Sequence, residues 1–243
     1  MSRSRLFTTV KWLVVVAMPI FLGFSTIRLF VNNAELYVRY EYGKASFPPD
    51  LHNIGEVQRQ RLDLEPFTPE QRRELALVAV EYLQRPEPPP AVIHLLEEQR
   101  LPGTDRPLYN EAEIDHMLDV KRLTDAIARI NWFAAAIVLG GLGILAVRRQ
   151  TRHIVYEALF HGGVATVTVL LFIGLFILLA WNTFFVQFHE LLFPPDSWSF
   201  AYTDSLIRLF PEKFWFDFGV LLSVTALLLG VVTGLLGYLL RRK

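Results

Sequence analysis

Four apolar stretches, each close to twenty residues long, limit what this chain can fold into more than any other feature. They cover residues 12–31, 130–147, 164–185 and 218–240. A helix that crosses a membrane needs about twenty mostly apolar residues, because each residue adds only about 1.5 Å to its length. The composition agrees, since 52% of the residues are hydrophobic, more than in an ordinary soluble domain. The sequence therefore predicts an all-α integral membrane protein with four transmembrane helices.

Basic residues beside the ends of these stretches predict the orientation in the membrane. They are Arg3, Arg5 and Lys11, then Arg148, Arg149 and Arg152, and finally Arg241, Arg242 and Lys243. Short loops rich in Lys and Arg stay in the cytoplasm, so both termini are expected to be cytoplasmic. The basic start resembles a signal peptide, but no small-residue cleavage site precedes Asn32-Asn33, so we expect the first span to be an anchor.

Alternation of the four spans divides the chain into five segments. Residues 1–31 form the cytoplasmic N-terminus and first span, residues 130–187 the second and third spans with their basic loop, and residues 218–243 the fourth span and basic tail. Residues 32–129 and 188–217 are expected to be extracytoplasmic, the latter as an aromatic loop, and to form a mainly helical head. Function is expected there, because the inward loops are nearly too short to hold a site.

Capping signals place two helices in the long outer segment. Thr68 followed by Pro69 and Gln71 fits a capping box, and this helix should run to Gln84, before Pro86. A second helix should begin at Asn110, with acidic residues in its first turn, and lead into the second span. Residues 35–42 fit either a strand or a helix.

His116 lies at the head of an apolar stripe on this second helix. The stripe consists of His116, Val120, Leu123, Ile127 and Ile130, at spacings of 4, 3, 4 and 3 residues. His116 should therefore point toward protein or substrate rather than bulk water. A straight helix would lift it about 18 Å above the membrane boundary near Ala128, so we expect this helix to bend or break, or the third span to extend beyond the lipid.

His189 follows the third span in an aromatic stretch near the outer interface. Its expected depth is that of lipid ester groups, although aromatic residues at this level are also typical of the belt of any membrane protein, and a single interfacial histidine is more often structural than catalytic. The remaining histidines are interpreted as structural or surface residues. They are His52, His94, His153 and His161.

Several function classes are excluded or disfavoured. The chain has no cysteine and a formal net charge of zero, so thiol chemistry is excluded and nucleic acid is not an expected partner. It contains no G-x-S-x-G, H-E-x-x-H or P-loop motif, which disfavours serine hydrolases, zincins and nucleotide-driven transporters. No span carries a central charged residue, which argues against an ion pump.

Two outer stretches resemble a known family. The segments Asp115-His-Met-Leu-Asp-Val-Lys121, Phe188-His-Glu-Leu-Leu-Phe-Pro-Pro-Asp-Ser-Trp198 and Asp204-Ser-Leu-Ile-Arg-Leu-Phe-Pro-Glu-Lys-Phe214 are similar to the signatures of the bacterial lipoprotein intramolecular transacylase (Lit) family. The four-span layout is similar too. The resemblance implies transfer of the sn-2 ester acyl chain of a diacylglyceryl lipoprotein to the α-amino group of its own N-terminal cysteine, with His116 and His189 as the essential residues.

The residue types suit this chemistry on their own. A neutral imidazole can take the proton of an amine, and a second imidazole can assist the carbonyl oxygen or the leaving glycerol oxygen. We expect His189 to be the base and His116 the donor, although nothing in the sequence fixes this order. Further substrate-binding or supporting residues are expected among Asp119, Lys121, Trp198 and Asp204, where Asp119 and Lys121 also fit a solvated helix face.

Two alternatives stay open. His116, His189 and a carboxylate such as Asp196 or Asp204 could hold zinc in a lipid hydrolase, although no compact ligand spacing is present. The chain could also be a non-catalytic membrane scaffold or lipid-binding protein with structural histidines. For the transacylase we expect a multi-pass protein of the bacterial plasma membrane, with no cofactor or metal, an extracytoplasmic site, a diacylglyceryl-modified lipoprotein as substrate and phospholipids as neighbours.

Overall fold

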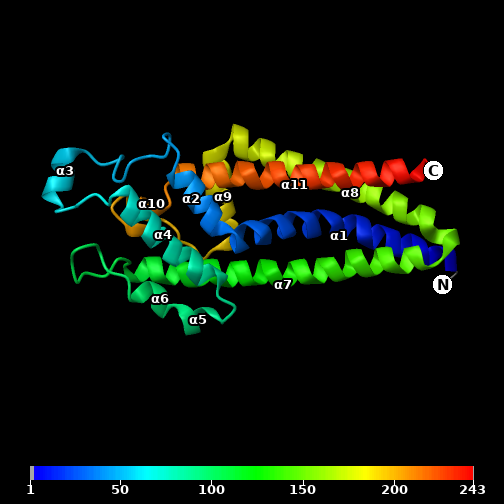
Figure 1. Ribbon diagram of the computed structural model, residues 1–243, viewed down its shortest axis with the longest axis horizontal. Helices are drawn as coiled ribbons and strands as arrows, with labels where there is room; N and C mark the ends of the chain where they lie inside the picture. Colours follow the sequence, from blue (N-terminus) through cyan, green and yellow to red (C-terminus); the bar gives the residue numbers. More distant parts are fainter. Residues whose placement is uncertain (1–2, 243) are drawn as a thin grey trace. The chain divides into compact units, whose positions relative to one another are not determined.

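The computed structural model describes residues 3–242, and this part of the chain is helical with no strands (Figure 1). The expected all-α class is therefore confirmed. A 3-10 turn, η1 (Arg149–Thr151), joins two of the helices. The helices are α1 (Arg3–Asn32), α2 (Ala34–Tyr42), α3 (Glu56–Arg61), α4 (Pro69–Gln84), α5 (Pro89–Val92), α6 (His94–Glu97), α7 (Glu111–Val147), α8 (Arg152–Leu179), α9 (Trp181–Leu192), α10 (Ser205–Leu209) and α11 (Glu212–Arg241).

The chain forms two compact units. The first unit consists of Met1–Leu29, Ala126–Trp181 and Gly219–Lys243, and the second of Phe30–Asp125 and Asn182–Phe218. Helix α7 contributes its polar first part to the second unit and its apolar run, residues 130–147, to the first.

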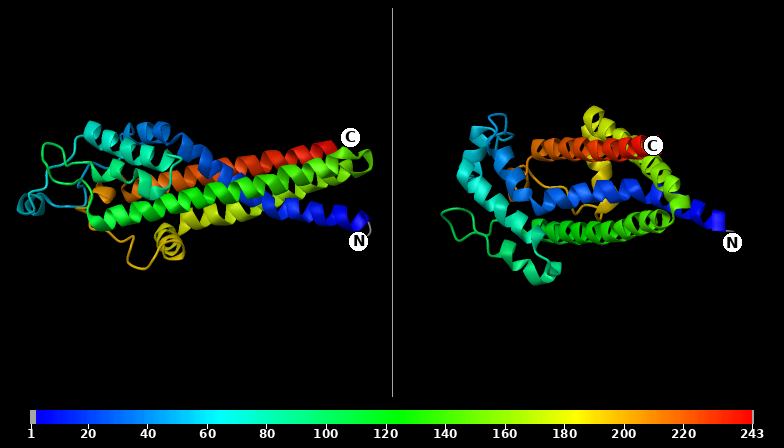
Figure 2. Two further views of the ribbon diagram at one scale, coloured as in Figure 1. Left: turned by 90° about the horizontal axis from the view of Figure 1, so that it is seen from below. Right: turned by 45° about the vertical axis from the view of Figure 1, so that its right-hand side comes forward.

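Four helices, α1, α7, α8 and α11, are long and apolar enough to cross a membrane. Their apolar parts run alongside one another in the first unit (Figure 2). The third span differs from expectation at its outer end, because α8 stops at Leu179 and a separate helix, α9, starts at Trp181. The break falls there and not in α7, which is one helix from Glu111 to Val147.

Glycines allow α8 and α11 to approach closely in the first unit. A Cβ added at Gly163 would lie 2.7 Å from the Gly230 carbonyl oxygen, and one added at Gly237 would lie 2.6 Å from the Tyr156 carbonyl oxygen. Such distances are far below van der Waals contact, so the backbones meet only because both positions lack a side chain. Small residues at helix contacts are typical of membrane bundles.

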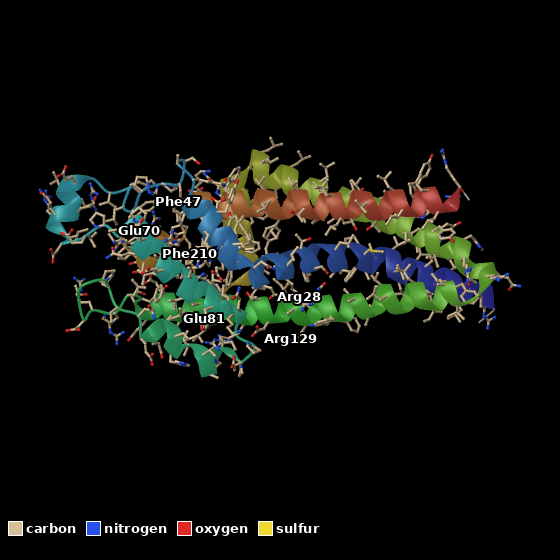
Figure 3. The ribbon with its side chains drawn as sticks, viewed as in Figure 1. Arg28, Phe47, Glu70, Glu81, Arg129 and Phe210 are labelled. Atoms are coloured by element: carbon tan, nitrogen blue, oxygen red, sulfur yellow. The ribbon has the colours of Figure 1, made fainter. Side chains whose placement is uncertain are left out.

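Apolar side chains fill the contact of α1 with α7 and α8, while others face outward. The buried cluster contains Val14, Ala17, Met18, Leu22, Val138 and Ala158. Outside it, Val16, Phe133 and Phe172 are 69%, 70% and 73% exposed, an arrangement suited to lipid rather than water. Arg28 on α1, labelled in Figure 3, stacks on the Trp132 ring of α7, 4.5 Å from its centroid.

Capping explains where the helices of the second unit begin. The Thr68 hydroxyl accepts from the Gln71 amide, while the Gln71 side chain accepts from the Thr68 amide, and α4 ends at Gln84 as expected. Residues 34–42 form helix α2, which settles the choice between strand and helix. An apolar core joins α4, α6, α7 and α10.

One carboxylate links the starts of two helices. Glu113 is 1% exposed, and its two oxygens accept from the Asn110 amide at 2.8 Å and the Leu206 amide at 2.7 Å. The Asn110 side chain in turn accepts from the Glu113 amide at 3.0 Å. Asn110 is therefore the cap of α7, as its sequence predicts, and the same acid serves α10.

A buried ion pair fixes the loop before α4 to α10. Arg208 donates to Asp50 at 2.8 Å, and their side chains are only 4% and 1% exposed. Asp50 also accepts from the amides of Leu51 and Phe67, so the buried carboxylate is fully hydrogen-bonded. Arg72 adds hydrogen bonds to the Arg208 and Pro48 carbonyls.

Candidate active site

Two histidines from distant parts of the chain lie together in the second unit. His116 is on α7 and His189 on α9, and the centroids of their rings are 6.5 Å apart with planes 25° from parallel. His116 is 9% exposed and His189 is partly buried. His116 precedes the apolar run of α7 that starts at residue 130, and His189 follows the end of α8, so both lie outside the apolar runs of these helices.

Aromatic rings enclose the pair. Phe193 contacts both imidazoles, with centroid distances of 4.9 Å to His116 and 5.5 Å to His189. Phe200 lies 5.3 Å from His116. The other rings on His189 are Phe185, Phe188 and Trp198, at 4.1, 5.3 and 5.0 Å. Because these rings displace water, charged forms are disfavoured and hydrogen bonds strengthened inside the cluster.

Contacts with the backbone indicate which nitrogen of each imidazole has a lone pair available to accept a proton. His189 Nδ1 lies 2.7 Å from the Phe185 carbonyl oxygen, so Nδ1 carries the hydrogen and Nε2 keeps its lone pair. His116 Nδ1 is buried without a hydrogen-bond partner among residues 3–242. The Ser197 backbone interacts with this ring in the sense that raises its pKa. Such an interaction favours the protonated ring.

Burial lowers the pKa of both histidines. The pKa of His116 is lowered to about 4 by burial and then by the neighbouring His189, while Asp119 and the Ser197 backbone act in the opposite direction. Burial also lowers the pKa of His189, against the effect of the Phe185 carbonyl. Both rings are therefore neutral near pH 7, and the pair does not hold two protons together.

Two of the expected supporting residues lie near the histidines. Trp198 packs on His189, as described above. Asp119 acts on the pKa of His116 through its charge, but its carboxylate accepts from Arg122 at 2.6 Å. Asp119 therefore influences His116 through its charge, while its ion pair is with Arg122.

The other two have structural partners. Lys121 is completely buried, and its ammonium donates to the Arg85 carbonyl at 2.7 Å and to Asp125 at 3.3 Å, so it ties the end of α4 to α7. Asp204 precedes α10 and accepts from the Ala201 amide at 2.8 Å. Neither side chain forms a described contact with His116 or His189.

Sequence reasoning missed the groups that orient the histidines. The Phe185 carbonyl and the Ser197 backbone carry no side-chain signal, and Phe193 and Phe200 could not be told from a general aromatic belt. The Pro194-Pro195-Asp196-Ser197 run is typical of a turn, but a turn by itself does not indicate which ring it touches.

Two of the remaining histidines have local backbone partners. His161 Nδ1 lies 2.7 Å from the Glu157 carbonyl and His52 Nδ1 lies 3.1 Å from the Pro49 carbonyl, in keeping with structural roles. Within residues 3–242, no group of three or more His, Cys, Asp or Glu side chains has a metal-binding arrangement.

Comparison with known sequences gives a family and one curated relative. A family model described as lipoprotein intramolecular transacylase Lit matches residues 11–215, which include both histidines. A protein of Aquifex aeolicus (strain VF5), described as uncharacterized, is 28% identical over 228 residues, covering 93% of this chain and 92% of the relative.

Solved structures show the same fold. The chain is similar to the in meso structure of the membrane-integral lipoprotein intramolecular transacylase Lit from Bacillus cereus, with 21% identity, a TM-score of 0.65, and coverage of 99% of this chain and 96% of that one. A histidine-to-alanine variant of the same enzyme gives 20% identity and a TM-score of 0.63 at the same coverage. A multi-pass membrane architecture is thereby established.

Proposed function

Because the chain belongs to the lipoprotein intramolecular transacylase (Lit) family, we propose that it transfers an acyl chain within one lipoprotein molecule. The acyl chain esterified at the sn-2 position of a diacylglyceryl-modified N-terminal cysteine moves to the α-amino group of that cysteine. The product is a lyso-form N-acyl lipoprotein with a free sn-2 hydroxyl. The single observation that carries this proposal is the pair of neutral imidazoles enclosed by aromatic rings.

His189 is the general base in this proposal. The attacking amine forms a bond to the ester carbonyl carbon and must lose a proton as it does so. Nε2 of His189 has a free lone pair because Nδ1 donates to the Phe185 carbonyl. The same nitrogen then delivers the proton to the glyceryl oxygen as the carbon–oxygen bond breaks, which restores the neutral ring.

His116 positions the amine. In this proposal Nε2 of His116 carries the hydrogen and faces the Ser197 backbone, so its buried Nδ1 offers a lone pair that can accept a second hydrogen of the amine. A pKa of about 4 keeps this ring neutral through the cycle. This geometry favours an acceptor over the donor role that the sequence suggested for His116, because a neutral ring has only one hydrogen to donate.

Proximity supplies much of the rate. The nucleophile and the ester are parts of one glyceryl-cysteine unit, and effective molarities for well-oriented intramolecular reactions reach about 10⁵ to 10⁸ M. A covalent acyl-enzyme is unnecessary, which agrees with a chain without cysteine. The aromatic cluster would hold the apolar part of the substrate and exclude water, so that transfer competes with hydrolysis.

The proposed setting is the outer face of a bacterial plasma membrane. Basic residues beside α8 and at the end of α11, among them Arg148, Arg149 and Arg242, support a cytoplasmic location of those ends. The second unit would then be extracytoplasmic, where mature lipoproteins carry their lipid-modified cysteine.

A reconstituted reaction tests the proposal. The purified chain in lipid nanodiscs is mixed with a synthetic diacylglyceryl lipopeptide, and mass spectrometry of fragments locates each acyl group. Wild type should move one acyl chain from glycerol to nitrogen without change of total mass. His189→Asn and His116→Asn should lose this conversion. A wild-type protein that binds the lipopeptide and leaves it unchanged would instead support a lipid-binding scaffold.

A further inference from the structure

The turn that follows α9 contains a residue in an unusual backbone conformation. Asp196 has a φ of 61°, in the left-handed region, and the other non-glycine residues with positive φ are Leu51 and Asp63 within the described chain. Its side chain is exposed and its carboxylate has no described hydrogen bond. The feature that distinguishes Asp196 is therefore its backbone and not its carboxylate.

The residues on either side of Asp196 touch the catalytic pair. Before it, Phe193 packs on both imidazoles. After it, the Ser197 backbone interacts with His116, and the Trp198 ring lies 5.0 Å from His189. One short turn thus supplies a contact to each histidine.

Hydrogen bonds close the turn around Asp196. The Ser197 amide donates to the Pro194 carbonyl at 3.3 Å, and the Ser197 hydroxyl donates to the same oxygen at 2.9 Å. Pro195 has a φ fixed by its ring, so the change of direction falls on Asp196. Asp, Asn and Gly adopt the left-handed conformation far more readily than β-branched residues.

We propose that Asp196 is a positioning residue for the acyl transfer, whose left-handed backbone holds the Phe193 ring against both imidazoles, the Trp198 ring against His189 and the Ser197 backbone beside His116. The role rests on the proposed transacylase function. It predicts that any residue able to adopt a positive φ can replace Asp196, whatever its charge. It also predicts that a β-branched residue will displace these contacts together.

Displacement of the turn should change how His116 titrates. The groups that act on its ring are His189, which opposes protonation, and Asp119 and the Ser197 backbone, which favour it. If the Ser197 backbone withdraws while Asp119 and His189 stay in place, His116 becomes harder to protonate. A purely structural effect on stability would leave this titration unchanged.

The experiment compares Asp196→Gly, Asp196→Asn and Asp196→Val with matched changes at Asp63. Asp63 has a φ of 51° and is also exposed, but it lies outside the turn. Each folded variant is assayed in nanodiscs for kcat and KM with the diacylglyceryl lipopeptide. The imidazole of His116 is titrated by NMR, which requires no turnover, with His116→Asn used to assign its signal.

Asp196→Gly and Asp196→Asn should keep wild-type kcat, whereas Asp196→Val should lose on the order of 10-fold in kcat or more, because small displacements of reacting groups are costly. Asp196→Val should also lower the apparent pKa of His116, and Asp63→Val should alter neither quantity. Equal kcat and equal titration in Asp196→Val and wild type would overturn the proposal, as would loss of kcat in Asp196→Gly. If wild type itself transfers no acyl chain, the proposed function fails, and the His116 titration still decides the positioning role.

Discussion

Acidification should destabilise the protein through His116, because the folded state holds this ring neutral. An unfolded histidine has a pKa of about 6.5, and burial among aromatic rings lowers the pKa of His116 to about 4. Between these values the unfolded state binds more protons than the folded state. The contribution is therefore complete above pH 6.5 and is lost as the pH falls toward 4.

The size of the effect follows from the two pKa values. Lowering the pH from 7.5 to 4.5 should remove about 2 to 3 kcal/mol of unfolding free energy through this residue. His189 has its pKa lowered as well and contributes in the same direction. Replacing His116 with Asn removes one titrating group and leaves the other, so the difference between the two proteins isolates His116.

Thermal unfolding of protein in detergent, followed by tryptophan fluorescence, measures this difference. Wild type should lose more stability between pH 7.5 and 4.5 than His116→Asn does. His52→Asn, which removes an exposed histidine of the same unit, is the matched control and should behave as wild type. An identical pH response of wild type and His116→Asn would refute the reasoning, since it would mean that His116 is as easily protonated in the folded state as in the unfolded one.

Four further results are expected. The acyl-transfer rate, measured by mass spectrometry between pH 5 and 8 and divided by the fraction of substrate amine that is neutral (amine pKa about 7.7 to 8.0), should decline only below pH 6.5, because the pKa of the base His189 is lowered; a decline of this corrected rate already beginning near pH 7.5 would contradict this. Gly163→Ala should lower stability by about 1 to 3 kcal/mol through overpacking, whereas Gly143→Ala should not lower it, because a Cβ at Gly143 has nothing within 4 Å and Ala is the better helix former; the thermal midpoints check both. Arg208→Met should cost about 3 to 5 kcal/mol by leaving Asp50 charged and buried, and adding Asp50→Asn should recover part of this loss in a double-mutant cycle. A chelator should leave the transfer rate unchanged, and a lost rate restored by zinc would favour the metal-hydrolase alternative.

Hydropathy and capping together predicted the four long helices and α4. Four apolar runs are enough to place the spans, because a segment that crosses a membrane must satisfy its backbone hydrogen bonds internally, as a helix does. Thr68 and Asn110 are local caps, so their helices begin where the sequence predicts. The sequence left residues 35–42 undecided, because a short segment of this kind fits both the strand and the helix period. In the structure they belong to helix α2.

The details of the site depended on contacts between distant segments. A break in α7 was one of the expectations and is absent, because α7 is one helix from Glu111 to Val147. The interruption lies instead at Ala180, where no neighbouring proline or glycine indicates it. Lys121 was expected to bind or support the substrate because it follows His116 in the family motif, or else to lie on a solvated helix face. It is not on a solvated face, because it is buried and donates to the Arg85 carbonyl and to Asp125. The Phe185 carbonyl that meets His189 lies four residues earlier on the same helix. The Ser197 backbone that acts on His116 comes instead from a distant segment, so no residue pattern near His116 could have indicated it.

Glu113 makes the two outer family motifs interdependent. Its carboxylate accepts hydrogen bonds from two backbone amides. One is that of Asn110, at the start of the helix that carries His116, and the other is that of Leu206, in the segment that follows His189. The side chain of Asp204, the residue before α10, makes no capping hydrogen bond. The cap is supplied instead by Glu113, more than ninety positions earlier in the chain. Replacing Glu113 would therefore remove the link between the start of α7 and the start of α10 without changing either imidazole. A loss of activity in such a variant would resemble a catalytic defect, although its cause would be faulty packing of the two segments.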